Sequence, residues 1–144
     1  MARETGAAAI AVRGETPEVC LVSSAEGQWS IPLALLGKGE VPKQTALRAL
    51  REASGVEAGL GDIDPRFYKT VEHVYRKGID KVRREVHVYK VLVKAEPSGG
   101  TWLPATEAVA RVTSKSVRDL LEAALGFAKP PPAPPAPKSR MDDE

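Results

Sequence analysis

The chain has 144 residues, of which 42% are hydrophobic and 28% charged, the composition of an ordinary soluble globular domain. The formal net charge of +2 does not by itself point to a nucleic-acid partner. The single cysteine, Cys20, excludes an internal disulfide and a metal site built on thiolates, and its apolar neighbours predict a buried, inert thiol. No long apolar segment follows the N-terminus, so we expect no signal peptide, no membrane span and a cytoplasmic location.

Turn residues separate the expected elements of the first half of the chain. These are strands at 6–12 and 19–23, an extended segment at 28–32, a loop at 33–40 and a helix at 42–54. The turn signals between the first two strands predict a hairpin. Pro42 suits the first turn of the helix, where its missing N–H has no partner to lose, and Gly55 ends the helix.

The second half is expected to contain strands at 67–75 and 85–94, a loop at 97–100 and a last helix. Both faces of the strand at 85–94 are substantially apolar, so we expect it to be central in a sheet. Ser116 is the predicted N-cap of the last helix because Asp119 follows three residues later, and Gly126 ends that helix.

Composition changes sharply at Lys129, where a run of prolines and alanines begins. Proline cannot donate a backbone hydrogen bond, so residues 129–144 are predicted to be a disordered, proline-rich tail behind a domain at 1–128. The tail is either a passive extension or a handle that binds the aromatic groove of a protein partner.

Lysines and arginines outnumber acidic residues between positions 66 and 94. Such a stretch forms either a solvated face or a site for a polyphosphate or nucleic-acid backbone. The two histidines, His73 and His87, lie on predicted strands without a carboxylate or cysteine at ligand spacing, so we expect them to be core or surface residues.

Residues 29–56 resemble the catalytic box of the Nudix family and its lead-in. The family signature is Gly, five residues, Glu, seven residues, Arg-Glu, an apolar residue, any residue, Glu-Glu, any residue, Gly and an apolar residue. The chain keeps this spacing, and the matching residues are Glu40, Arg48, Leu50, Glu52, Gly55 and Val56. The sequence Trp-Ser-Ile-Pro at 29–32 is similar to the family's Trp-Ser-Leu-Pro.

The resemblance extends over roughly residues 5–126. The segments at 76–89 and 102–108 resemble Nudix proteins that cut dinucleoside or diphosphoinositol polyphosphates. The resemblance implies an α/β fold, with helices on both faces of a mixed β-sheet in an α/β/α sandwich. It also implies a nucleotide or polyphosphate ligand, with RNA as a less supported alternative.

Three departures from the signature concern the metal site. Ala34 replaces the first glycine, and Ala49 and Ala53 replace two of the glutamates. In the family these glutamates converge on Mg²⁺, which takes oxygen ligands and bridges substrate phosphates. Glu52 is the one helix carboxylate left for the metal, so we expect Mg²⁺ binding to be weak or absent. Glu52 is either an ordinary i,i+4 partner of Arg48 or a single-point Mg²⁺ contact.

The resemblance implies a set of candidate site residues. Glu52, Arg48 and Glu40 occupy catalytic positions, and Glu40 is expected to brace the loop against Arg48 more than to catalyse. The candidates for substrate binding are Lys38, Arg76, Lys81 and Arg83.

Two functions from different classes remain open. One is a non-catalytic binding domain with an impaired metal site and weak or no hydrolase activity. The other is an active, divergent Mg²⁺-dependent pyrophosphohydrolase whose ligands lie outside the box, with Glu96 and Glu107 as candidates.

Overall fold

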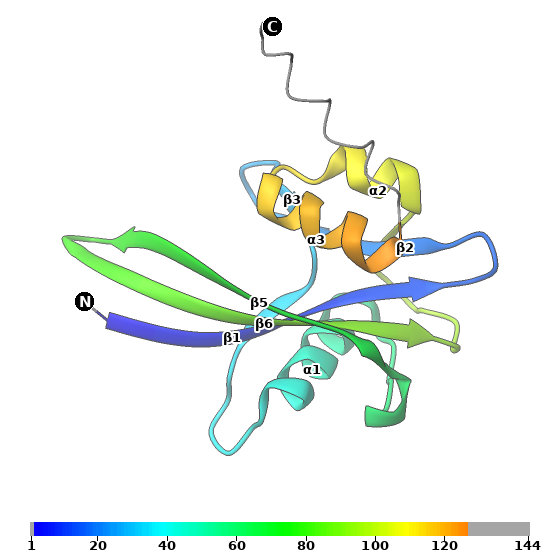
Figure 1. Ribbon diagram of the computed structural model, residues 1–144, viewed down its shortest axis with the longest axis horizontal. Helices are drawn as coiled ribbons and strands as arrows, with labels where there is room; N and C mark the ends of the chain where they lie inside the picture. Colours follow the sequence, from blue (N-terminus) through cyan, green and yellow to red (C-terminus); the bar gives the residue numbers. More distant parts are fainter. Residues whose placement is uncertain (1, 127–144) are drawn as a thin grey trace, which may run out of the picture.

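A computed structural model describes residues 2–126 of the chain. A seven-stranded mixed sheet lies at its centre, and Figure 1 shows helices on both faces. Helix α1 (Pro42–Ser54) covers one face, and helices α2 (Ala105–Arg111) and α3 (Lys115–Leu125) cover the other. The predicted α/β/α sandwich is therefore confirmed. The predicted domain end at residue 128 and the tail at 129–144 lie outside the described residues.

The sheet has the strand order β3-β2-β1-β6-β5. The bounds of these strands are Trp29–Ser30 for β3, Glu18–Ser23 for β2, Ala2–Arg13 for β1, Asp80–Val93 for β6 and Ile63–Lys77 for β5. Strand β1 runs parallel to β6 and antiparallel to β2, which makes the sheet mixed. The expected hairpin of the first two strands and the expected central strand are both confirmed, since β6 lies between β1 and β5.

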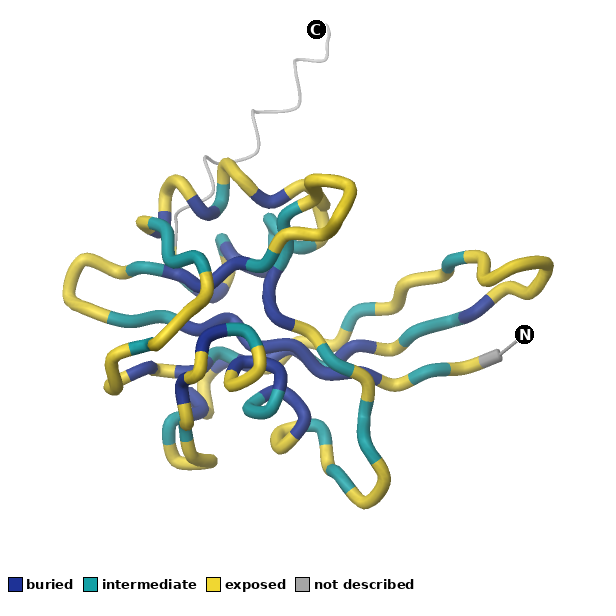
Figure 2. Tube along the Cα trace, turned by 180° about the vertical axis from the view of Figure 1, so that it is seen from behind, coloured by how far each residue is buried: buried dark blue, intermediate teal, exposed yellow. Residues whose placement is uncertain are grey.

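Two hydrophobic clusters hold the layers together, one on each face of the sheet. Alternation along β1 divides its side chains between them, with Ala7 and Ala9 toward α1 and Ile10 toward α3. Leu50 from α1 and Leu121 from α3 are fully buried against these faces. Burying one such leucine contributes about 1.5–3 kcal/mol. Figure 2 shows the buried residues where the strands pass between the helices.

Helix α1 has the predicted bounds. Pro42 occupies its first turn, and the Gln44 side chain accepts a hydrogen bond from the Val41 backbone N–H at 3.1 Å. Gly55 ends the helix with φ 76°, a left-handed conformation that favours glycine.

The structure corrects several predicted elements. Residues 33–40 were expected to form a loop, but β4 (Leu33–Leu35) pairs with β1 at Gly6, Ala7 and Ala8. The predicted N-cap of α3 is also wrong, because Ser114 caps the helix two residues before Ser116. Strand β7 (Thr101–Pro104), which pairs with β2, and the short 3-10 helix η1 (Leu60–Asp62) were not predicted.

Strands β5 and β6 project past the helices as a long hairpin, and the start of β1 runs beside it (Figure 1). We call residues 70–87 the hairpin extension. Most of its residues are exposed, unlike the strands between the helices (Figure 2). Among the residues that the structure describes, no helix is long and apolar enough to cross a membrane.

Candidate functional site

Arg48 contacts several residues of the loop and helix that resemble the catalytic box. Its Nε donates to Glu40 Oε2 at 2.8 Å, and its Nη2 donates to Glu40 Oε1 at 3.0 Å and to the Leu35 carbonyl at 2.8 Å. Its Nη1 lies 3.3 Å from Glu52 Oε2, one helical turn away. One guanidinium therefore engages both carboxylates that the box retains.

The Glu40 carboxylate is further occupied by its own loop. Its Oε1 accepts the Gly37 N–H at 2.7 Å and the Thr45 hydroxyl at 2.8 Å. The Arg48 guanidinium, followed by these two donors, lowers the pKa of Glu40 from 4.5 to about 2. This arrangement fits the expectation that Glu40 braces the loop against the helix.

The residues present do not fit the divalent-metal site that the family resemblance implies. Ala49 is 4% exposed and faces the protein interior, and neither it nor Ala53 has a side-chain oxygen to offer a metal. Glu52 is exposed, but it shares the Arg48 guanidinium with Glu40. Within residues 2–126, no group of three or more His, Cys, Asp or Glu side chains could hold a metal ion.

The two carboxylates outside the box have arginine partners of their own. Glu96 lies 3.3 Å from Arg13, and its side chain is 90% exposed. Glu107 lies on α2, on the opposite face of the sheet from α1, and pairs with Arg111 at 3.2 Å.

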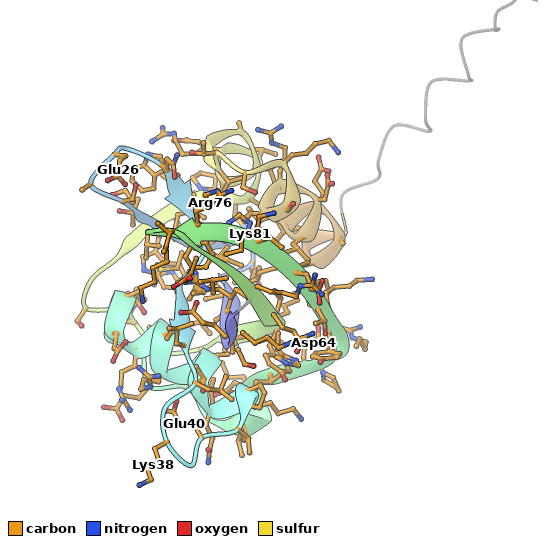
Figure 3. The ribbon with its side chains drawn as sticks, turned by 90° about the vertical axis from the view of Figure 1, so that its left-hand side faces the viewer. Glu26, Lys38, Glu40, Asp64, Arg76 and Lys81 are labelled. Carbon is orange, nitrogen blue, oxygen red and sulfur yellow. The ribbon has the colours of Figure 1, made fainter. Side chains whose placement is uncertain are left out.

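The predicted substrate-binding residues fall into two separate groups (Figure 3). Arg76 and Lys81 are directly opposite each other near the tip of the hairpin extension, and both are exposed. Arg83 lies further along β6, where its Nη1 is 3.9 Å from Glu72. Lys38 lies at the tip of the loop before α1, beside Glu40 and apart from the hairpin pair.

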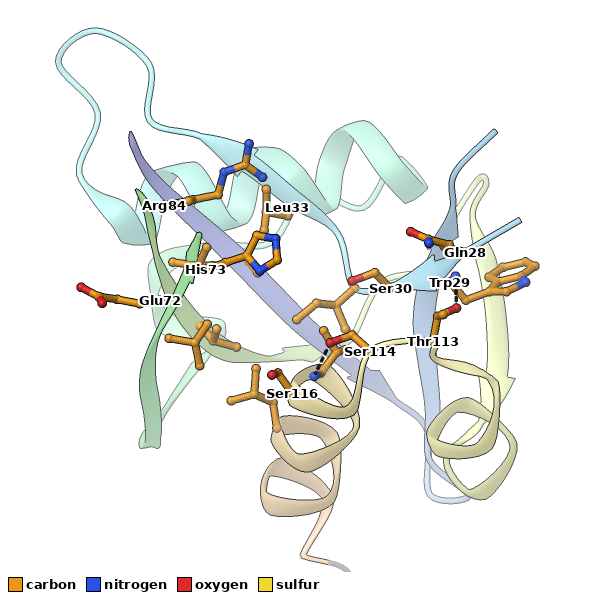
Figure 4. Close-up of a pocket in the computed structure, with 17 residues that line it drawn as sticks. Gln28, Trp29, Ser30, Leu33, Glu72, His73, Arg84, Thr113, Ser114 and Ser116 are labelled. Atoms are coloured by element: carbon orange, nitrogen blue, oxygen red, sulfur yellow. Dashed lines mark hydrogen bonds between the residues drawn. The ribbon is translucent and has the colours of Figure 1, made fainter. Parts of the chain in front are cut away.

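A pocket of about 510 Å³ opens between the hairpin extension, the segment around β3 and β4, and the start of α3 (Figure 4). Its floor is apolar, with Val86 and Val88 from β6 and Leu120 from α3. The polar residues that line it are Gln28, Ser30, Glu72, His73, Arg84, Thr113, Ser114 and Ser116. This mixture of an apolar floor and several convergent polar groups is typical of a small-molecule site.

Most of these pocket residues were not predicted as site residues from the sequence. His73 was expected to be a core or surface histidine, and it is exposed, lines the pocket and stacks on Tyr75 with ring centroids 6.0 Å apart. His87 lies on the other face of the hairpin extension, where its Nδ1 is 2.6 Å from the Tyr68 hydroxyl. The Trp-Ser lead-in was the one sequence signal for this region, since both residues line the pocket.

Comparisons with known proteins agree with this architecture. The family model for the NUDIX domain matches residues 2–134. The Ap4A hydrolase of C. elegans, solved as a binary complex, is 16% identical with a TM-score of 0.63, over 86% of this chain and 96% of that chain. The dihydroneopterin triphosphate pyrophosphohydrolase of E. coli is 16% identical with a TM-score of 0.62, over 89% of this chain and all of that chain (100%).

A third similar structure is a complex of a Nudix domain with a nucleotide ligand. The NUDIX domain of Shewanella oneidensis NrtR, complexed with ADP ribose, is 18% identical with a TM-score of 0.58, over 88% of each chain. A search of curated proteins found no match. Because the family model matches nearly the whole chain and the solved structures share its sandwich of helices around a mixed sheet, the chain belongs to the Nudix family.

Proposed function

We propose that this Nudix domain binds a nucleotide or a related phosphorylated ligand and has lost ordinary Mg²⁺-dependent pyrophosphohydrolase activity. The observation that carries the proposal is that the box has few carboxylates and that those present are paired with an arginine. Glu40 and Glu52 both bond to Arg48, and Ala49 and Ala53 supply no ligand atoms. A Mg²⁺ ion needs several hard oxygen ligands, and this helix has one carboxylate, already shared with an arginine.

The pocket between the hairpin extension and α3 supports the proposal that the domain binds such a ligand. Its volume of about 510 Å³ suits a ligand of nucleoside size, with apolar walls for a flat base and hydroxyl and amide groups for orientation. The structurally similar NrtR domain was solved with ADP ribose, which is a ligand of this class. Arg76 and Lys81, exposed at the hairpin tip, are the cations that we assign to phosphate groups reaching around the tip, because strand alternation directs their side chains to the face of the hairpin opposite the pocket.

An active, divergent hydrolase is the second candidate. The observation that favours it is the exposure of Glu96, whose carboxylate can change partners because its side chain is 90% exposed. Glu107 is less suited to this role because it lies on the opposite face of the sheet from the box helix.

Further aspects of the proposal rest on the sequence. An RNA ligand would use the same basic hairpin, and a protein partner would use the proline-rich residues 129–144. A cytoplasmic location fits the lone Cys20, which is fully buried and whose pKa burial raises to about 11.

The test pairs ligand binding with turnover. Nucleosides, nucleotides and dinucleoside polyphosphates are screened by thermal shift and calorimetry, and the same compounds are incubated with Mg²⁺ or Mn²⁺ to detect hydrolysis. We expect at least one nucleotide to bind and none to be hydrolysed at an enzymatic rate. Turnover in the wild-type protein would instead favour the second candidate, and Glu96→Gln and Glu107→Gln would then locate the metal ligands.

A matched pair of variants connects binding to the pocket. Ser116→Trp fills the exposed edge of the pocket from α3, and Ala123→Trp places the same side chain on an exposed position of the same helix outside it. We expect Ser116→Trp to abolish binding and Ala123→Trp to preserve it. Equal affinities in the two variants would exclude this pocket as the binding site.

A further inference from the structure

We propose that Glu4, at the start of β1, determines the charge selectivity of the pocket by neutralising Arg84, so that the pocket accepts an uncharged group in preference to an anionic one. This inference rests on the proposed function, because it concerns the ligand of the same pocket. It assigns a role in specificity to Glu4, a residue of β1 that does not itself line the pocket.

Arg84 controls the charge of the pocket. It is the one lysine or arginine among the described residues that line it. Glu72 is the one acidic lining residue, but Figure 4 shows its side chain pointing away from the pocket, and its carboxylate lies 3.9 Å from Arg83. Arg84 and His73 lie together at one end, opposite the hydroxyl groups of α3.

The Arg84 guanidinium is held from the side of β1. Its Nε donates to Glu4 Oε1 at 3.1 Å, and its Nη2 lies 3.0 Å from the same oxygen. The Tyr75 hydroxyl donates to Glu4 Oε1 at 2.6 Å, and the guanidinium lies 4.8 Å from the centroid of the Tyr75 ring. The carboxylate and the aromatic ring together satisfy the cation that would otherwise attract an anion into the pocket.

Strand pairing fixes this arrangement. Glu4 is directly opposite Arg84 in the parallel β1–β6 ladder, so its side chain emerges on the same face of the sheet as the pocket. The two side chains are 21% and 25% exposed, so water screens the pair only in part. The Tyr75 hydroxyl and Arg84 also lower the pKa of Glu4, which keeps it ionised at neutral pH.

The test removes the charge of Glu4 and keeps its shape. Glu4→Gln leaves an amide oxygen that can still accept from Tyr75 and Arg84, but the guanidinium is no longer neutralised. The control is Glu18→Gln, which also removes a strand glutamate paired with an arginine, Arg13 at 3.2 Å, away from the pocket. Binding of adenosine and of AMP to each protein is measured by calorimetry.

We expect Glu4→Gln to raise the affinity for AMP relative to adenosine by about tenfold, which is the size of one incompletely screened charge interaction. Glu18→Gln is expected to leave the ratio unchanged. The double variant Glu4→Gln/Arg84→Gln is expected to lose the gain, because the effect acts through Arg84. A change below twofold in Glu4→Gln, or an equal change in Glu18→Gln, would overturn the inference.

A second readout separates this inference from the proposed function. Inorganic pyrophosphate is expected to raise the melting temperature of Glu4→Gln and to leave the wild type and the double variant unchanged. If the wild type binds no nucleoside, nucleotide or dinucleoside polyphosphate in the screen above, the proposed function fails, and the pyrophosphate result still decides the role of Glu4. No stabilisation of Glu4→Gln by pyrophosphate in that case would overturn the inference as well.

Discussion

Arg48 and Glu40 join the loop of residues 35–40 to helix α1 through a set of short, charged hydrogen bonds. The pairing holds the loop against the helix through side chains of the chain itself. It also makes the loop sensitive to acid, because the arginine stabilises only the ionised form of Glu40.

The pKa of Glu40 predicts an acid-dependent loss of stability. In the folded protein it is lowered to about 2, below the ordinary 4.5, so the ionised carboxylate stabilises the fold above pH 4.5 and this contribution disappears as the pH falls toward 2. We expect Glu40→Gln to destabilise the protein at pH 7 and to flatten the fall in stability over this window. Urea unfolding of both proteins across pH 2–7 measures the difference.

The pH profile of Glu40→Gln must be compared with that of the wild type, because a second carboxylate titrates in the same window. Arg66 also lowers the pKa of Asp64 to about 2. Glu26→Gln, on the exposed β2–β3 turn, is the control and should keep the wild-type pH profile. A parallel profile for Glu40→Gln and wild type would show that the Arg48 pair does not stabilise the fold.

Restoring a glutamate at position 49 is predicted to be destabilising. A glutamate on a solvent-facing helix position would cost little stability, but Ala49 is 4% exposed. Burying a carboxylate there without a partner is expected to cost about 2 kcal/mol or more. Denaturant unfolding of Ala49→Glu measures this cost, and Ala123→Glu on the exposed face of α3 is expected to change stability by no more than about 0.5 kcal/mol.

An unchanged stability of Ala49→Glu would mean that α1 can shift on the sheet to let the side chain reach water. The same variant would then be suitable for rebuilding the metal site together with Ala53→Glu.

Among the helices and strands, the sequence predicted those whose start, end and apolar pattern lie within one short segment. Helix α1 has its proline, its apolar spacing and its terminal glycine within the span of residues 42–55, and its bounds were correct. Strand β4 was missed because a three-residue strand depends on a distant partner. Its pairing with Gly6 places the Ala34 carbonyl 3.0 Å from where a Cβ would lie, and only glycine leaves that space.

For the candidate site too, the sequence predicted only the part that lies in one continuous segment. The box lies in one continuous segment, so the missing carboxylates were visible in the sequence. The pocket joins Ser30, Arg84 and Ser114 from three distant segments, and no spacing rule brings them together. The Glu4–Arg84 contact likewise depends on the register of a parallel strand pair.

The N-cap of α3 gives a test at this scale. Ser114 accepts the Val117 N–H at 3.5 Å, whereas Ser116, the N-cap predicted from sequence, lies inside the helix. We expect Ser114→Ala to destabilise the protein by about 0.5–1 kcal/mol. Ser116→Ala should stay within about 0.5 kcal/mol of wild type, since alanine favours helix. Thermal unfolding that shows the larger loss in Ser116→Ala would contradict the observed cap.

For the whole molecule, the described residues form a sandwich with one hydrophobic cluster on each face of the sheet. Gly126 ends the last helix, α3, ahead of the proline-rich run in the sequence. Removing the chain after Lys129 is expected to change the melting temperature by no more than a few degrees, because the proline and alanine run offers no apolar period to bury. Differential scanning calorimetry of the full and shortened chains measures this, and a larger drop would show that the tail packs on the domain.

We propose that this Nudix domain has a ligand pocket but no functional Mg²⁺ site. Calorimetric titration of the wild-type protein with Mg²⁺, followed by an Ap4A and nucleotide turnover assay on the same sample, tests it most directly. We expect no saturable Mg²⁺ binding at millimolar concentration and no turnover above the background rate, in a sample that still binds a nucleotide. Saturable Mg²⁺ binding together with Mg²⁺-dependent hydrolysis by the unmodified chain would contradict it.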